Sequence, residues 1–236
     1  MAPFWQALAK DPELKDYQMN SPPRPITDPA AAGRLLAAAD GVLWDFNGTI
    51  SLDEDLFAEI YVAAVAELLD MHLSQEKYDA QCMGRSDLEI VVELADEAGR
   101  PELADVLLDR VSEQYSAAVA AEPRIPQSHA DLVLALAAAG KRMGVVTGSL
   151  HRLVEPALGA AGLADAVEFV ITAEDITEGK PHPEGFLRGA ELLGLRPDQI
   201  VGVEDSPAGL AALAAAGMAA VDVGPGRCDL AQVRID

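Results

Sequence analysis

Three apolar runs in the sequence each end on side chains that could take part in chemistry. The run "GVLW" leads to Asp45, and the run "RMGVV" leads to Thr147. A third run, "QIVGV", leads directly into Glu204 and Asp205, and the stretch "GKPHPEGF" between the last two runs holds Lys180 beside prolines. A carboxylate at the end of a strand can attack phosphorus or carbon, or it can bind a hard cation.

The types of these side chains suit a charged, oxygen-rich ligand. Two adjacent acids opposite a third predict an oxygen-ligand site for Mg²⁺. The hydroxyl of Thr147, with the backbone N–H groups of Gly148 and Ser149 at the start of a helix, is typical of an anion-binding turn. Each motif alone also has an ordinary explanation, such as a helix cap or a surface lysine. Because all four follow one order at predicted strand ends, coincidence is a poor explanation.

The elements that must position these residues indicate an α/β protein. Half of the 236 residues are hydrophobic, which is enough for a sizeable core. Predicted helices at residues 128–139, 150–161, 184–194 and 206–216 alternate with the apolar strands "RMGVVT", "VEFVIT", "QIVGVED" and "AAVDVG". This alternation predicts a Rossmann-like parallel sheet core covered by helices on both faces. Ligands of such sheets bind beyond the carboxyl ends of the strands.

The proline content and the hydrophobic spacing along the chain predict three regions. Residues 1–27 include "NSPPRPIT" and form a Pro-rich arm, because prolines oppose regular helix and sheet. Residues 53–123 are amphipathic at three- and four-residue spacing, which predicts an inserted all-helical cap. Residues 28–52 and 124–236 then make up the α/β core. The alternative is that the helices of residues 53–123 simply cover the sheet.

Charge and composition limit the partners. Lys and Arg number 17 against 39 Asp and Glu, so the net charge is −22. Nucleic acid and an anionic membrane surface are therefore poor partners, although a small phosphorylated molecule is acceptable where a metal and local cations offset the field. The start resembles no signal peptide, no apolar stretch is long enough to span a membrane, and Cys82 and Cys228 lack metal-ligand spacing. We therefore expect a cytoplasmic protein.

Together, "WDFNGTI", "VVTGS", "GKPHPEGF" and "VGVEDSPAG" resemble the four motifs of the haloacid dehalogenase (HAD) superfamily. The resemblance extends from about residue 40 to residue 225 and is greatest to the sugar-phosphate phosphatase and β-phosphoglucomutase branch. It implies a helical cap between the first two motifs. It also implies that the cap stretch "MGRSDLEIV" faces the substrate, so that Gly84, Arg85 and Ser86 are candidate specificity residues.

The resemblance also implies roles for the motif residues. Asp45 would be the nucleophile that forms an aspartyl phosphate, while Thr147 and Lys180 would hold phosphoryl oxygens, with Gly148 and Ser149 in the same anion-binding turn. The implied Mg²⁺ ligands are Asp45, the backbone carbonyl of Asn47, Glu204 and Asp205. The expected activity is a Mg²⁺-dependent phosphatase acting on a small phosphorylated metabolite of the sugar or polyol type.

One residue departs from the family pattern. The phosphatases have an Asp two residues after the nucleophile, which acts as general acid and base, and this chain has Asn47 there. An amide exchanges no proton near neutral pH, so we expect this form to be slow or inactive. Asn47 is then an introduced substitution in a phosphatase, or the native residue of a non-catalytic protein that binds a phosphorylated metabolite. A phosphomutase is a further alternative, and dehalogenase or phosphonatase chemistry fits less well because only Lys77 could serve as a cap lysine.

Overall fold

The computed structural model describes residues 24–82 and 85–235. Its centre is a five-stranded sheet in the order β3-β2-β1-β4-β5, in which every neighbouring pair is parallel. The strands are β1 (Gly41–Trp44), β2 (Arg142–Val146), β3 (Val170–Ile171), β4 (Ile200–Glu204) and β5 (Ala219–Asp222). The predicted parallel α/β core is confirmed, although only Val170–Ile171 of the expected strand "VEFVIT" form a strand, at the edge of the sheet.

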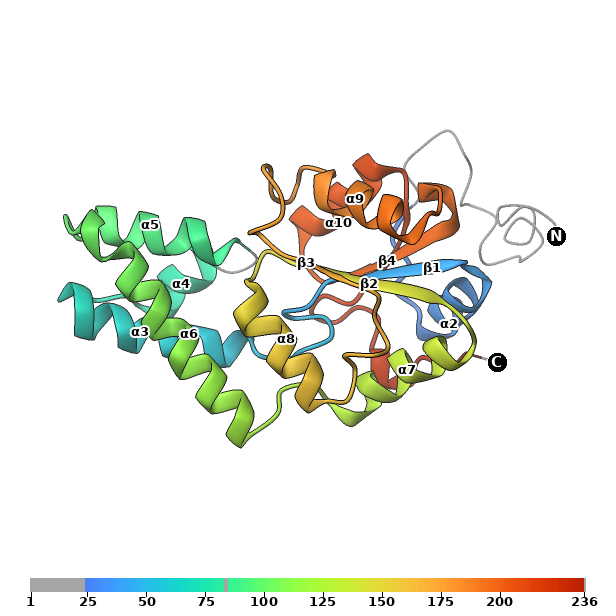
Figure 1. Ribbon diagram of the computed structural model, residues 1–236, viewed down its shortest axis with the longest axis horizontal. Helices are drawn as coiled ribbons and strands as arrows, with labels where there is room; N and C mark the ends of the chain where they lie inside the picture. Colours follow the sequence, from blue (N-terminus) through green and yellow to red (C-terminus); the bar gives the residue numbers. More distant parts are fainter. Residues whose placement is uncertain (1–23, 83–84, 236) are drawn as a thin grey trace.

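Helices cover both faces of this sheet, as Figure 1 shows. The helices are α2 (Pro29–Ala38), α7 (Gln127–Ala138) and α8 (His151–Ala160) on one face, and α9 (Glu184–Leu193) and α10 (Pro207–Ala216) on the other. Each face buries its own apolar cluster, because the central strands are buried on both sides. Asp28 caps α2 by accepting a hydrogen bond of 2.8 Å from the N–H of Ala31.

A second group of helices lies beside the sheet-containing part (Figure 1). It consists of α3 (Glu54–Leu69), α4 (Gln75–Gln81), α5 (Asp87–Glu97) and α6 (Ala104–Ala121). Among the described residues, the apolar cluster of these helices includes no strand residue, and it extends into the core only at Leu150 and Leu153. The arm, core and cap boundaries stay a prediction, which this separate cluster supports. The described residues also include three short 3-10 helices: Pro101–Leu103, Pro197–Gln199 and Leu230–Gln232.

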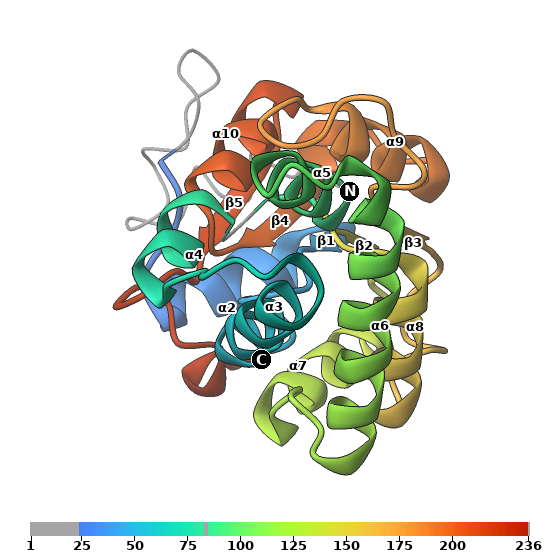
Figure 2. The ribbon, with the colours of Figure 1, turned by 90° about the vertical axis from the view of Figure 1, so that its left-hand side faces the viewer.

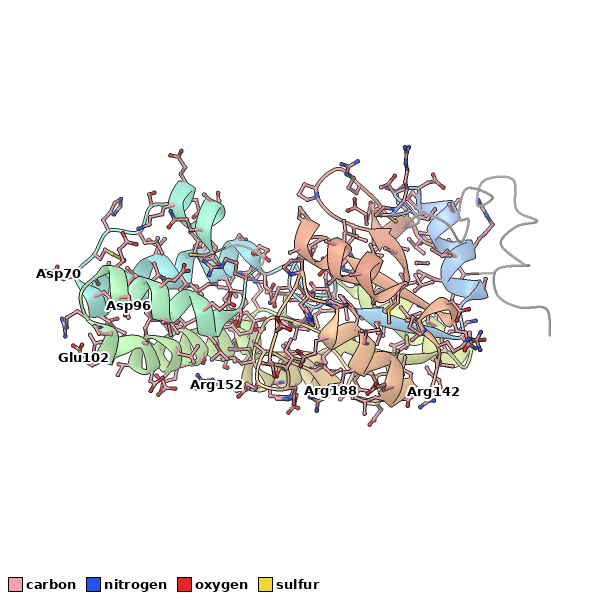
Figure 3. The ribbon with its side chains drawn as sticks, turned by 90° about the horizontal axis from the view of Figure 1, so that it is seen from above. Asp70, Asp96, Glu102, Arg142, Arg152 and Arg188 are labelled. Atoms are coloured by element: carbon pink, nitrogen blue, oxygen red, sulfur yellow. The ribbon has the colours of Figure 1, made fainter. Side chains whose placement is uncertain are left out.

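The two groups of helices touch where α6 packs along α8 (Figures 1 and 2). An ion pair of 2.7 Å between Arg152 of α8 and Asp109 of α6 crosses this contact. Figure 3 shows Arg152 between Asp70, which lies in the helical group, and Arg142, which lies in the sheet-containing part. The helical group is therefore held against the core at a defined place.

Only the end of the predicted Pro-rich arm lies within the described residues. Ile26 pairs with the edge strand β5: its N–H donates to the carbonyl of Ala220 at 2.8 Å, and its carbonyl accepts from the N–H of Asp222 at 2.9 Å. The arm prediction for residues 1–23 falls outside the described part of the chain. No described helix is long and apolar enough to cross a membrane.

Candidate active site

The acidic residues singled out by the sequence come together at the carboxyl edge of the sheet. Asp45 follows β1, Glu204 is the last residue of β4, and Asp205 comes next. Since β1 and β4 are paired neighbours, one carboxylate oxygen from each of the three residues lies within 4.8 Å of the others. Three hard oxygen donors at this distance fit a cation such as Mg²⁺.

Lys180 lies between two of these carboxylates. Its Nζ donates to Oδ1 of Asp45 at 2.5 Å and to Oε1 of Glu204 at 2.6 Å. All three side chains are almost fully buried, and the ammonium group also lies 5.3 Å from the centre of the Phe186 ring. A loop and two strand ends thus place one cation among three acids.

Burial and mutual repulsion shift the pKa values in this cluster. Burial raises the pKa of Asp45 well above its usual value, against the opposing effect of Lys180. Burial, followed by repulsion from Glu204, raises the pKa of Asp205 to about 6. Burial disfavours the charge of Lys180, but the adjacent Asp45 and Glu204 outweigh it and raise its pKa. The cluster therefore holds excess negative charge, which a divalent cation would relieve.

Two glycines make room for the acids. A Cβ on Gly209, in the first turn of α10, would lie 1.6 Å from Oε1 of Glu204. Gly48 has a φ of +74°, and a Cβ there would lie 2.3 Å from Oδ2 of Asp205. Ser206 caps α10, and its own N–H donates to Oε2 of Glu204 at 2.6 Å. The turn "EDSPAG" therefore fixes both the helix and the carboxylates.

The turn after β2 contacts the cap. The N–H of Ser149 donates to Oγ1 of Thr147 at 3.1 Å, and the Oγ of Ser149 donates to Oδ2 of Asp87 at 2.9 Å. Asp87 is the first residue of the cap helix α5, and its carboxylate also accepts a hydrogen bond of 2.8 Å from the hydroxyl of Tyr61. A Cβ on Gly148 would lie at ordinary contact distance from the backbone of Arg85 and Ser86. The turn after β2 therefore lies directly against the cap residues that precede α5.

Asn47 is held by a residue that the sequence did not single out. Its Nδ2 donates to both carboxylate oxygens of Asp53 at 3.2 Å, and its Oδ1 accepts from Oγ1 of Thr147 at 3.4 Å. Burial raises the pKa of Asp53, although hydrogen bonds from neighbouring side chains oppose this. An acid directly before a helix is typical of an N-cap, but the side chain of Asp53 makes no capping hydrogen bond to α3.

A cavity of about 960 Å³ joins these groups to the cap. Its core wall includes Asp45, Asn47, Thr147, Lys180, Glu204 and Asp205, and its cap wall includes Glu54, Tyr78, Arg85, Ser86 and Asp87. Ser86 and Arg85 therefore lie where a specificity loop was expected, while Gly84 lies outside the described residues. The sequence did not single out Glu54, whose pKa burial raises to about 7, with Asp53 and Asp205 adding to the effect.

Arg85 lines the cavity, but its charge is already paired. The guanidinium donates to Glu93 at 2.6 and 2.9 Å, to the carbonyl of Gln81 at 2.9 Å, and lies 3.5 Å from Glu89. These partners belong to the cap itself. In this arrangement Lys180 is the cation that faces the acids of the core.

The chain belongs to the haloacid dehalogenase-like hydrolase family, whose model matches residues 39–217, more than half of the chain. Hexitol phosphatase A of Escherichia coli is 43% identical over 79 residues, which are 34% of this chain and 36% of that protein. Phosphoglycolate phosphatase of Salmonella typhimurium is 35% identical over 116 residues, 49% of this chain and 46% of that protein. The chain thus spans less than half of the length of these relatives.

Among solved structures, a CbbY mutant from Rhodobacter sphaeroides in complex with xylulose-(1,5)bisphosphate has a TM-score of 0.70 to this chain. The two are 23% identical, and the match covers 77% of this chain and 84% of the other. At this identity the likeness shows a shared fold. The sequence-based assignment to the HAD superfamily is confirmed.

Proposed function

We propose that this protein has a Mg²⁺-dependent phosphatase site for a small phosphorylated metabolite, with Asp45 as nucleophile. The observation that carries the proposal is the position of Lys180, which bonds Asp45 and Glu204 at 2.5 and 2.6 Å beside Asp205. One buried cation among three acids suits phosphoryl transfer, because that reaction depends on positioning and charge neutralisation. Family membership supports the same reaction class.

In the proposed reaction, a carboxylate oxygen of Asp45 attacks phosphorus, and the bond from phosphorus to the ester oxygen breaks. The products of this step are an aspartyl phosphate and an alkoxide. Lys180 and Thr147 hold phosphoryl oxygens, and water then attacks the same phosphorus to release inorganic phosphate and free Asp45. Mg²⁺, held by Asp45, the backbone carbonyl of Asn47, Glu204 and Asp205, would neutralise charge on the phosphoryl group.

Asn47 limits this reaction. An amide neither supplies nor accepts a proton near neutral pH, so in this chain the alkoxide takes its proton from bulk water and the attacking water loses its proton to bulk water. General acid–base catalysis contributes typically 10²–10⁴-fold, so the protein as it stands should be slower than an Asn47→Asp variant by about that factor. A protein that binds a phosphorylated metabolite without turnover is the second candidate, and the contact between Asn47 and Asp53 favours it.

The charges of the cap wall favour a neutral leaving group such as a sugar or polyol. The cavity is lined on the cap side by four acids: Glu54, Asp79, Asp87 and Glu89. Arg85, the arginine in the described lining, is paired with Glu93. An acidic leaving group such as glycolate would meet these carboxylates with no free cation among the described residues of that wall. The similarity to a hexitol phosphatase agrees with this choice.

The test is phosphate release by the Asn47→Asp variant with Mg²⁺ on sugar phosphates, polyol phosphates and phosphoglycolate. We expect turnover of the first two classes, and none when Asp45→Asn is added. Turnover that persists without Asp45 would exclude this residue as the nucleophile. If no ester is hydrolysed but inorganic phosphate still raises the Tm, the binding function is correct. An isomerised ester without free phosphate would indicate a phosphomutase.

A further inference from the structure

Asp53 accepts hydrogen bonds from three side chains that belong to two distant parts of the chain. Nδ2 of Asn47 lies 3.2 Å from each carboxylate oxygen, the hydroxyl of Ser51 lies 2.7 Å from Oδ2, and the hydroxyl of Tyr115 lies 2.5 Å from Oδ2. Asn47 and Ser51 belong to the segment after β1, whereas Tyr115 belongs to the cap helix α6. One fully buried carboxylate therefore joins the segment after β1 to the cap helix α6.

This carboxylate has no competing role in the helix that it precedes. Asp53 occupies the N-cap position of α3 but makes no capping hydrogen bond, so its oxygens are directed to side chains. Tyr115 is fully buried and stacks on Phe57 of α3 with ring centres 4.3 Å apart. The phenol is thus fixed by packing, and it holds Asp53 from the cap side.

The two ends of the Asn47 amide match their surroundings. Its Nδ2 donor faces Asp53, and an ionised carboxylate only accepts hydrogen bonds; its Oδ1 acceptor faces the hydroxyl of Thr147. An Asp at position 47 would replace the donor with a carboxylate oxygen about 3 Å from both oxygens of Asp53, because Asn and Asp are nearly isosteric. Like charges in a buried contact are unfavourable.

We propose that Asp53 is a positioning residue that orients the amide of Asn47 and ties it to the cap through Tyr115, so that this site is built around an amide. Asn47 and Asp53 then form a complementary pair. The consequence for phosphoryl transfer rests on the function proposed above, whereas the pairing itself does not. In that reaction, the pair keeps an acceptor at position 47 facing Thr147 and the cavity.

The first test is thermal unfolding of the full chain with substitutions at both positions. We expect Asn47→Asp to lower the Tm by about 5 °C, because it creates a buried like-charge contact. Adding Asp53→Asn restores a donor opposite the new acid, and the Tm should return most of the way to that of the unchanged protein. The difference between the stability change of the double variant and the sum of the two single changes measures the interaction between residues 47 and 53.

Asp87→Asn is the matched control in this series. Asp87 is also a buried carboxylate that accepts hydrogen bonds from two hydroxyl groups, those of Tyr61 and Ser149. Among the described residues, however, the side chain of Asn47 bonds to Asp53 and Thr147 and not to Asp87. Asp87→Asn should therefore fail to rescue Asn47→Asp. If Asn47→Asp melts no lower than the unchanged protein, or if Asp53→Asn and Asp87→Asn act alike in its background, the proposal is wrong.

The second test reads the orientation of the amide in the folded protein and does not depend on the stability of Asn47→Asp. In a ¹H–¹⁵N spectrum, the side-chain signals of Asn47 should shift with Tyr115→Phe, which removes one hydroxyl donor from Asp53 and keeps the ring. Tyr61→Phe removes the corresponding donor from Asp87 and should leave the signals in place. Equal shifts, or none with Tyr115→Phe, would overturn the link. Neither test uses a substrate, so failure here is distinct from failure of the phosphatase proposal.

Discussion

The ammonium group of Lys180 lies 2.5 Å from the carboxylate of Asp45, and both side chains are nearly inaccessible to water. A loop after β3 thus supplies a charge to a residue that follows β1, and the same charge reaches Glu204. Buried ion pairs contribute little when compared with apolar packing, but the removal of one partner leaves an uncompensated charge. This asymmetry makes Lys180 the most sensitive point of the cluster.

Replacement of Lys180 by Met should destabilise the protein by about 3 kcal/mol in the absence of Mg²⁺, because three acids lose their cation. Denaturant unfolding with and without Mg²⁺ measures the effect, and Mg²⁺ should stabilise the variant more than it stabilises the unchanged protein. Lys77→Met is the control, since Lys77 forms a half-exposed ion pair with Glu97, and such pairs contribute about 0–1 kcal/mol. Equal losses in both variants would contradict the assigned role of Lys180.

Gly209→Ala should destabilise the protein, although alanine normally favours a helix over glycine by about 1 kcal/mol. The new Cβ would lie 1.6 Å from Oε1 of Glu204, so the carboxylate or α10 must move. Gly159→Ala in α8 is the control, because a Cβ there meets nothing within 4 Å and should be neutral or stabilising. A stabilised Gly209→Ala protein would mean that α10 does not need this close approach to Glu204.

Much of the fold follows from local patterns in the sequence. Buried runs such as Gly41–Trp44 and Ile200–Glu204, alternating with helices, predict parallel strands, and they pair as expected. The carboxyl ends of paired parallel strands share one edge, so the meeting of Asp45 with Asp205 was also predictable. The strand expected over "VEFVIT" is shorter than predicted, because only Val170–Ile171 form β3. The N–H of Glu168 and the carbonyl of Phe169 still form hydrogen bonds with the backbone of β2.

The parts that were not predictable depend on contacts between distant elements. Asp53 is typical of a helix cap in the sequence, and its contact with Tyr115 crosses 62 positions of the chain. Arg85 was expected to face the substrate, and it does line the cavity. Its pairing with Glu93 depends on how the loop joins α5, and no spacing rule specifies that geometry.

Glu54→Gln should stabilise the protein at neutral and higher pH. Burial raises the pKa of Glu54 from 4.5 in a model peptide to about 7 in the folded protein, so the folded state binds this proton more tightly than the unfolded state. Stability is therefore lost as the pH rises through the interval from about 4.5 to about 7, and it stays lost above that. The Tm advantage of Glu54→Gln should grow across this interval and then level off.

The control for this pH series is Glu59→Gln, which removes an exposed acid from the same helix α3. It reports the general effect of one fewer negative charge on a protein with a net charge of −22. If both variants follow the same curve, the acids that surround Glu54 do not determine its protonation. If the Tm advantage rises with pH for Glu54→Gln but not for Glu59→Gln, the burial of Glu54 in the cavity raises its pKa.

Ser149→Ala should loosen the contact between the turn after β2, residues 147–149, and the cap helix α5. The hydroxyl of Ser149 donates to the buried carboxylate of Asp87 at 2.9 Å, and hydrogen bonds to charged groups contribute about 1.5–3 kcal/mol. We expect a loss of that order in denaturant unfolding, with faster amide hydrogen exchange at the start of α5. Ser112→Ala is the control, because that buried hydroxyl bonds the carbonyl of Leu108 within its own helix, an arrangement that adds little to helix stability. Unchanged exchange in α5 for Ser149→Ala would show that the cap is held at α6 and α8 rather than through this hydrogen bond.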